Sequence, residues 1–341
     1  MRTAALDRAL ADAGADAFVH VGPPGDPTVS SLAGGRLPVR AAVVYGGRVA
    51  VVPERALPDR VSVREAATVL DAVSTPAQRL PDLVGDAVLA PRTLPHDAAL
   101  YLENDGVSVT STDAVERARA AKTDGERERV EAAQTAAEAG MAAAAALLAA
   151  AEGAPLADGE GKVTAERVRR AANAAMAAEG ATPRTVVGAD GAIAPADPVL
   201  VRVTPRVDGY HGVLARTFVA DTDGGWERRA TLACEYAVDA AIDVVDVGET
   251  TAAAAAEEAT AELGSYGFPP TAGTGRVHGV GLERRERPLG DEPIEPGAVL
   301  AVRADLDAER RVWAADLAVA TADGVERVGS FPHSVVPRAD Y

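Results

Sequence analysis

The sequence is poor in cysteine, lysine and aromatic residues. It has a single cysteine, Cys234, which excludes an intrachain disulfide. Aromatic residues make up 4% of the 341 residues, so any hydrophobic core must be built mainly from alanine, valine and leucine. Cys234 lies in an apolar segment with helical spacing, and we expect it to be a small core residue.

Positive charge is also scarce. The chain has 51 acidic residues against 34 basic ones, a formal net charge of −17, and only Lys122 and Lys162 are lysines. Such a surface repels phosphate backbones and anionic lipid headgroups, so we expect neither nucleic acid nor membrane as a partner. Acidic excess with few lysines is typical of halophilic proteins, in which concentrated salt screens the self-repulsion. The alternative is an ordinary acidic cytosolic protein.

The chain lacks a long apolar run. The longest, residues 141–151, is too short to span a bilayer. The N-terminal segment has no charged region followed by an apolar one, so it does not resemble a secretory signal. We therefore expect a cytoplasmic protein.

The length suits two domains. Residues 1–118 alternate between helical and strand-like patterns: a helix over 3–14, a hairpin through Gly46-Gly47, a helix over 63–73, and strands near 87 and 108. This pattern predicts a compact α/β domain. Residues 119–341 contain a longer set of elements, in which a pair of helices followed by strands occurs twice.

The second domain begins with an alanine-rich helical segment. Residues 113–153 form one helix or two, with a break near Asp124-Gly125. Thr164 is a candidate N-cap for the next helix, and Asp208-Gly209 marks a turn in a strand hairpin. Two further helices, near 229–248 and 250–267, precede a strand-rich region that extends to residue 329.

Several segments, in order, resemble the creatinase/aminopeptidase family of the pita-bread fold (M24). They are "LDRALADAGADAFVHVG", "ERARAAKTDGERERVEAAQTAAEAG", "DGYHGVLARTF", "HGVGLERRERP" and "IEPGAVLAVRADL" followed by "VWAADLAVATADG". The resemblance, of the Xaa-Pro aminopeptidase/prolidase type, implies an α+β pita-bread domain over 119–341. It also implies a smaller creatinase-like α/β domain over 1–118 and a homodimer.

The resemblance further implies two divalent metal ions held by two Asp, one His and two Glu, which activate a bridging water. In this chain those five positions are occupied, in chain order, by Arg202, Val213, His278, Arg303 and Ala315. A sixth family position, a His that contacts substrate, corresponds to Arg285. Only His278 is retained as a ligand, and we therefore expect no metal and no cofactor.

The two arginines at ligand positions bring positive charge where cations would sit. At contact distance, like charges repel by on the order of a few kcal/mol. We therefore expect a vestigial pocket of Arg202, Arg216, His278 and Arg303 that binds a small anion or a peptide, because guanidinium forks suit carboxylate and phosphate. The alternative is that the arginines pair with Asp208, Asp305 or Asp316 and fill a closed cavity, and that His278 is a core residue.

Three functions remain open. The first is a non-catalytic binding or scaffold homologue of the Xaa-Pro aminopeptidase/prolidase type. The second is an enzyme, either a peptidase with displaced ligands or a creatinase-like hydrolase that works without metal. The third is a structural partner of an active paralogue in a hetero-oligomer. No catalytic residue is assigned, and we expect Trp226 and Trp313 to be packing residues.

Overall fold

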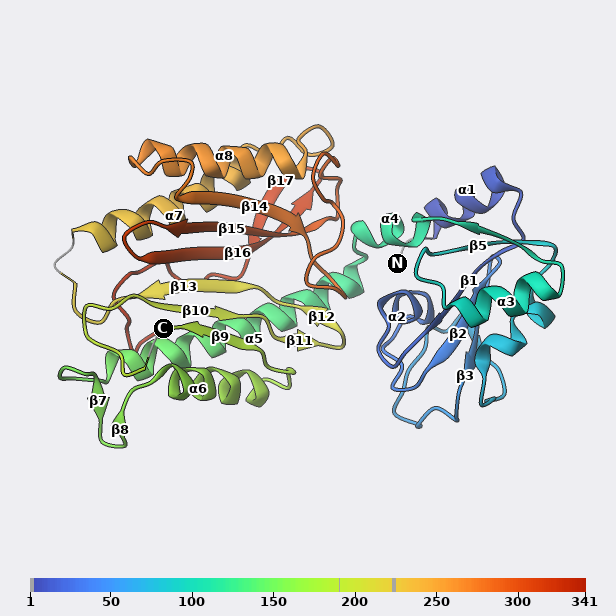
Figure 1. Cartoon of the computed structure of the whole chain (residues 1–341), viewed down its shortest axis with the longest axis horizontal. Coiled ribbons are helices and arrows are strands. Elements are labelled where there is room, and N and C mark those ends of the chain that lie inside the picture. The colour runs from blue at the N-terminus through green and yellow to red at the C-terminus, as the bar shows by residue number, and fades with distance from the viewer. Residues whose placement is uncertain (1–2, 190, 223–224) are drawn as a thin grey trace. The chain divides into compact units, whose positions relative to one another are not determined.

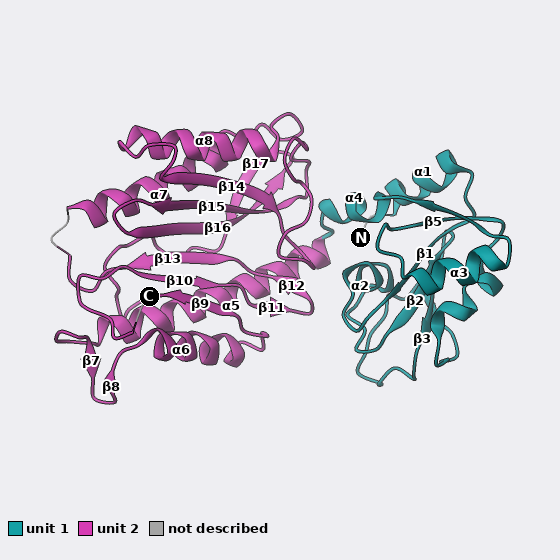
Figure 2. Ribbon diagram, in the orientation of Figure 1, with its two compact units in different colours: residues 1–123 teal, residues 124–341 magenta. Residues whose placement is uncertain are grey.

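The computed structural model describes residues 3–189, 191–222 and 225–341. The chain forms two compact units, residues 1–123 and 124–341 (Figures 1 and 2). The predicted boundary after residue 118 lies within helix α4 (Ala114–Ala120). No helix within the described ranges combines the length and the apolar character needed to cross a bilayer.

The first unit is a six-stranded sheet with helices on both faces. The strands are β1 (Ala17–Gly22), β2 (Ala41–Tyr45), β3 (Val49–Pro53), β4 (Ala67–Val69), β5 (Ala87–Ala90) and β6 (Ser108–Ser111), in the order β4-β3-β2-β1-β5-β6. Helices α1 (Ala4–Ala13), α2 (Pro27–Ala33) and α4 pack on one face, and α3 (His96–Asn104) packs on the other. The α/β character predicted for this part of the chain is confirmed.

Local patterns predicted most of this unit. The hairpin through Gly46-Gly47 joins β2 to β3, and Gly47 has the positive φ of 79° that favours glycine. The helix expected over 63–73 is wrong, because Val49 and Val51 of β3 pair in register with Ala67 and Val69. Sheet pairing at this edge overrides the local helix propensity.

The second unit contains four long helices: α5 (Asp124–Ala149), α6 (Ala165–Ala178), α7 (Trp226–Asp243) and α8 (Ala252–Ser265). The expected break in the alanine-rich segment falls at residues 121–123, between α4 and α5. Thr164 caps α6 as predicted, since its Oγ1 accepts a hydrogen bond from the Arg167 N–H at 3.3 Å. Cys234 is fully buried in α7, which confirms its assignment to the core.

These helices cover one face of a seven-stranded sheet (Figure 1). Its strands run in the order β14 (Gly273–Gly279), β15 (Val299–Asp307), β16 (Arg311–Thr321), β13 (Leu214–Phe218), β10 (Val199–Val203) and β9 (Thr185–Gly188), with β17 (Gly324–Val328) also paired to β16. Two small hairpins lie outside it: β7 (Ala157–Asp158) with β8 (Gly161–Lys162), and β11 (Arg206–Val207) with β12 (Tyr210–His211). Asp208 and Gly209 form the turn of the second hairpin, as predicted, both with positive φ.

Strand alternation places both helix pairs on the same face. Leu214 and Phe218 of β13 pack in the core that α5 and α6 cover, and Ala314 and Ala318 of β16 pack in the core that α7 and α8 cover. Because Ala215 and Ala315 are register partners, the even-numbered residues of both strands point the same way. The predicted pita-bread arrangement is thus confirmed, and the odd-numbered residues of β13 and β16 point to its inner face.

Candidate functional site

A row of register partners crosses the inner face of the sheet. Arg202 of β10 pairs with Ala215 of β13, Ala215 pairs with Ala315 of β16, and Ala315 pairs with Arg303 of β15. Two arginines therefore flank two alanines on neighbouring strands. Because alanine side chains are short, this row leaves space above the sheet between the arginines.

His278 belongs to the next row on the same face. It pairs with Ala301 of β15, two residues from Arg303. One cavity of about 250 Å³ is lined by Arg184, Arg202, Thr204, Val213, His278, Arg284, Arg285, Ala301, Arg303 and Ala315, and is called here the arginine cavity. The structure thus brings together all five positions that the resemblance associates with metal ligands.

Positive charge in the arginine cavity is largely uncompensated. Arg303 Nε donates a hydrogen bond to Asp305 Oδ1 at 2.7 Å. Within the described ranges, no ion pair with a carboxylate is found for the other four arginines of the cavity: Arg184, Arg202, Arg284 and Arg285. Burial lowers the pKa of Arg202, and the nearby charge of Arg303 lowers it further. The side chain nevertheless remains charged, since arginine is not deprotonated in proteins.

Trp313 organises the two inner arginines. The guanidinium carbons of Arg202 and Arg303 lie 5.1 Å and 5.6 Å from the centroid of its ring, within the range of cation–π contacts. The backbone N–H of Trp313 donates to Thr217 Oγ1 at 3.0 Å, which fixes the strand beneath the ring. The prediction that Trp313 is only a packing residue is wrong, because its partly buried ring contacts two charged side chains.

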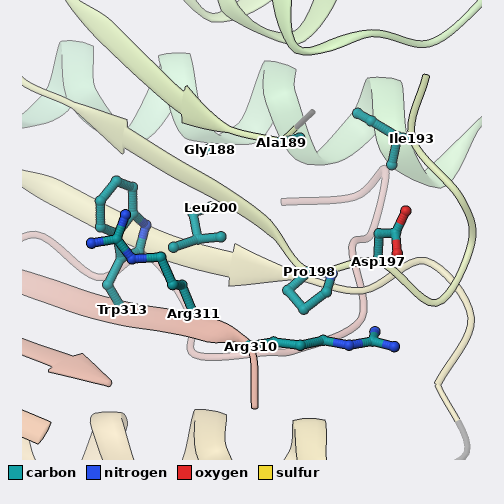
Figure 3. A pocket seen from close by; sticks show the side chains of 9 residues that line it. All are labelled: Gly188, Ala189, Ile193, Asp197, Pro198, Leu200, Arg310, Arg311 and Trp313. Carbon is teal, nitrogen blue, oxygen red and sulfur yellow. The ribbon is translucent and has the colours of Figure 1, made fainter. Parts of the chain in front are cut away.

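A second cavity, of about 460 Å³, also has Trp313 in its wall (Figure 3). Its other lining residues come from the end of β9, from the loop between β9 and β10, from β10 itself and from the start of β16: Gly188, Ala189, Ile193, Asp197, Pro198, Leu200, Arg310 and Arg311. Arg310 and Arg311 are exposed, and none of the five family ligand positions lies here. The arginine cavity is therefore the candidate functional site.

The protonation of His278 follows from one contact. Its Nδ1 lies 3.0 Å from the Gly279 carbonyl oxygen, which can only accept a hydrogen bond, so Nδ1 carries the proton. Burial lowers the pKa of His278, which favours the neutral ring. The lone pair of Nε2 is then available as a hydrogen-bond acceptor in the cavity.

Arg216 does not lie in the arginine cavity. It is buried on the helix-covered face, where its Nη2 lies 2.8 Å from Asp316 Oδ1 and donates to the Phe331 carbonyl oxygen at 3.0 Å. The expectation that Arg216 converges with Arg202 and Arg303 is wrong. Arg216 follows Ala215 in the strand, and neighbouring residues point to opposite faces.

The donors of the arginine cavity do not fit a pair of metal ions. Metal sites need several ligands of suitable type, and this cavity offers the imidazole of His278 and no carboxylate. In the part of the chain that the structure describes, no group of three or more His, Cys, Asp or Glu side chains could hold an ion. No step of a reaction is therefore assigned to a metal here.

Sequence reasoning missed Arg184 and Arg284 as cavity residues and placed Arg285 only through the family resemblance. The signal for two of them is the consecutive pair in "LERRERP", which follows His278 by a few residues. Arg184 had no such signal, because it reaches the cavity only through the position of β9 at the sheet edge.

Comparison with known proteins identifies relatives of this fold. The profile of metallopeptidase family M24 matches residues 128–323. A Xaa-Pro dipeptidase from Bacillus anthracis superposes with a TM-score of 0.83 at 16% identity, covering 97% of this chain and 98% of the other. The prolidase of Pyrococcus horikoshii OT3 gives 0.79 at 17% identity, covering 97% and 99%.

A third similar structure is the N-terminal domain of the FACT complex subunit SPT16 from chickpea, Cicer arietinum. Its TM-score is 0.71 at 16% identity, covering 96% of this chain and 94% of the other. No curated protein sequence matches the chain. At such low identities these likenesses establish the fold alone.

Proposed function

The chain belongs to metallopeptidase family M24, and we propose that it is a member that has lost the dinuclear metal site and binds a ligand without hydrolysing peptides. One observation carries this proposal. The five positions associated with metal ligands line a single cavity, and four of them carry arginine, valine or alanine. The metal-ligating side chains are therefore replaced, while the cavity that they line is kept.

The electrostatics of the cavity oppose metal binding. A dinuclear site concentrates about four positive charges that carboxylates normally balance. In this cavity Arg202 and Arg303 add two further positive charges and contribute no lone pair. A metal ion would meet one imidazole and a repulsive field, so water-activating metal chemistry is not supported.

The fold itself does not decide between hydrolysis and binding. Fold and function are separable, since function depends on the residues of the site. The similar structures include a dipeptidase and a prolidase, and also a domain of a subunit of the FACT complex. The residues of the arginine cavity therefore carry more weight than the shared architecture.

The proposal is tested by metal content and by activity. The purified protein is incubated separately with Mn²⁺, Co²⁺ and Zn²⁺, desalted, and measured by inductively coupled plasma mass spectrometry. Xaa-Pro dipeptides are then assayed at low and high salt. We expect metal far below one ion per chain and no hydrolysis beyond that of the His278→Ala variant, which lacks the one retained ligand.

Three results would contradict the proposal. Two ions per chain with turnover would show a peptidase with displaced ligands. Turnover by metal-free protein, abolished by His278→Ala, would show a metal-independent hydrolase. A catalytic homologue that co-purifies in fixed stoichiometry, with no ligand bound by this chain, would instead show a structural subunit.

A further inference from the structure

We propose that the arginine cavity binds a small organic polyanion that carries at least two acidic groups and a hydroxyl group. This inference rests on the proposed function, because it requires that metal ions do not occupy the same cavity. It adds the chemical class of the ligand, which follows from the charge, the geometry and the hydrogen-bonding groups of the cavity.

The first argument is charge. Arg202 and Arg303 are partly buried, and Arg184, Arg284 and Arg285 are exposed around them. Charged groups taken out of water need a partner. Asp305 forms ion pairs with Arg303 and Arg276, and none with Arg202 is found among the described residues. A ligand with two or more negative charges would remove the mutual repulsion and supply the partner that Arg202 lacks among the described residues.

The acidic surface of the chain confines anion binding to the arginine cavity. The chain as a whole carries a net charge of −17, so most of its surface repels anions. The exposed arginines of the cavity attract an anion locally, and the guanidinium groups of Arg202 and Arg303 then bind it. Cationic ligands, including the ammonium group of a free peptide N-terminus, are repelled by the same field.

The second argument is geometry. Arg202 and Arg303 both contact the ring of Trp313, which holds their guanidinium groups near one another before any ligand binds. Each planar guanidinium can donate two parallel hydrogen bonds to a carboxylate or a phosphate. Two such forks above a floor of Ala301 and Ala315 suit a ligand with two acidic groups and a short carbon frame.

The third argument concerns His278. Its Nδ1–H is engaged by the Gly279 carbonyl, so in the neutral ring Nε2 is the hydrogen-bond acceptor. Ionised carboxylates have no hydrogen to donate, and a ligand hydroxyl group does. The cavity volume of about 250 Å³ lies just below the usual range for drug-sized ligands and limits the ligand to a small metabolite.

Isothermal titration calorimetry on the full-length protein tests this inference, with ionic strength held constant by NaCl. Citrate and tricarballylate form a matched pair of tricarboxylates that differ by one hydroxyl group. We expect citrate to bind about tenfold more tightly, because tricarballylate leaves the His278 acceptor unpaired. 3-Phosphoglycerate and 3-(phosphonooxy)propanoate form a second matched pair. Each carries a carboxylate and a phosphate, only the first has a hydroxyl group, and the pair shows which acid the cavity prefers.

Three variants connect binding to the cavity. Arg202→Gln should weaken the binding of the preferred probe about tenfold or more, since it removes one guanidinium fork. Arg228 is an exposed residue of α7, the helix that packs against the other face of the sheet. Arg228→Gln makes the same charge change and should leave binding unchanged. His278→Ala should abolish the preference for the hydroxylated probe while anion binding persists.

The inference is overturned if metal-free, folded protein binds none of the four probes. It is also overturned if Arg202→Gln and Arg228→Gln weaken binding equally, which would show a nonspecific charge effect. Metal occupancy with peptide turnover would instead contradict the proposed function, and metal analysis separates that failure from the absence of anion binding.

Discussion

Arg216 and Asp316 form a buried ion pair, with Arg216 Nη2 2.8 Å from Asp316 Oδ1, directly behind the arginine cavity. Each residue follows an alanine, Ala215 or Ala315, that faces the inner side of the sheet. His333 Nε2 lies 3.0 Å from Asp316 Oδ2 on the helix-covered side. The same two strands therefore carry the arginine cavity on one face and a buried ionic network on the other.

Replacing Asp316 by Asn should destabilise the protein by about 3–5 kcal/mol, because Arg216 would be left buried without a counter-charge. The double variant Arg216→Met, Asp316→Leu should be less destabilised than Asp316→Asn, since it removes both charges. Urea denaturation of the three proteins at pH 7 provides the measurement. A double variant as unstable as Asp316→Asn, or less stable, would contradict this account.

His211 should make stability fall between pH 6.5 and pH 4. Burial lowers its pKa to about 4, and the charges of Arg206 and Arg284 act in the same direction, against that of Glu286. In this interval the unfolded chain binds a proton that the folded protein does not, so stability decreases as pH falls. The loss is on the order of 2 kcal/mol.

The measurement is the urea midpoint of the parent and of His211→Gln at pH 7, 5.5 and 4. The variant should show a shallower decrease than the parent over this interval, because it has no imidazole to protonate. Parallel decreases in the two proteins would assign the pH dependence to other groups.

Gly279, the residue after His278, should not tolerate a side chain. A Cβ at this position would overlap the Arg287 carbonyl oxygen, which belongs to the backbone and cannot move aside alone. Gly279→Ala should therefore cost several kcal/mol, on the scale of an overpacked core. Gly264→Ala in α8 is the matched control, because its Cβ meets open space and alanine favours helix. Thermal unfolding should separate the two variants clearly, and equal midpoints would disprove the steric argument.

Restoring the carboxylates should restore affinity for divalent cations. A restored variant combines the family's ligand types with the native His278. It carries four substitutions: Arg202→Asp, Val213→Asp, Arg303→Glu and Ala315→Glu. We expect it to bind Mn²⁺ or Co²⁺ in calorimetry, while the parent gives no heat. A version that also carries His278→Ala should bind more weakly, since it lacks the fifth ligand. If the folded restored variant binds no metal, the assignment of these positions to the metal site is wrong.

The sequence predicted the elements whose patterns are local. Helical spacing placed α5 to α8, Thr164 marked the start of α6, and Asp208 marked a turn. It gave no helix for α2, because the N-cap Asp26 and the following proline lie in a segment rich in glycine and proline. The helix predicted over 63–73 is strand β4 instead. A three-residue strand at a sheet edge forms through its pairing with β3, which the local pattern does not reveal.

By itself, the sequence determined the family and the pita-bread architecture, because ordered motifs and residue types are properties of the chain. It also predicted which positions correspond to the family's metal ligands. Only the tertiary structure decided which arginines share a cavity. Strand register brings Arg202 and Arg303 to one face and turns Arg216 to the other, and the sheet edge adds Arg184. The pairing of distant strands sets these relationships, and a shift of one residue moves a side chain from the cavity into the ionic network.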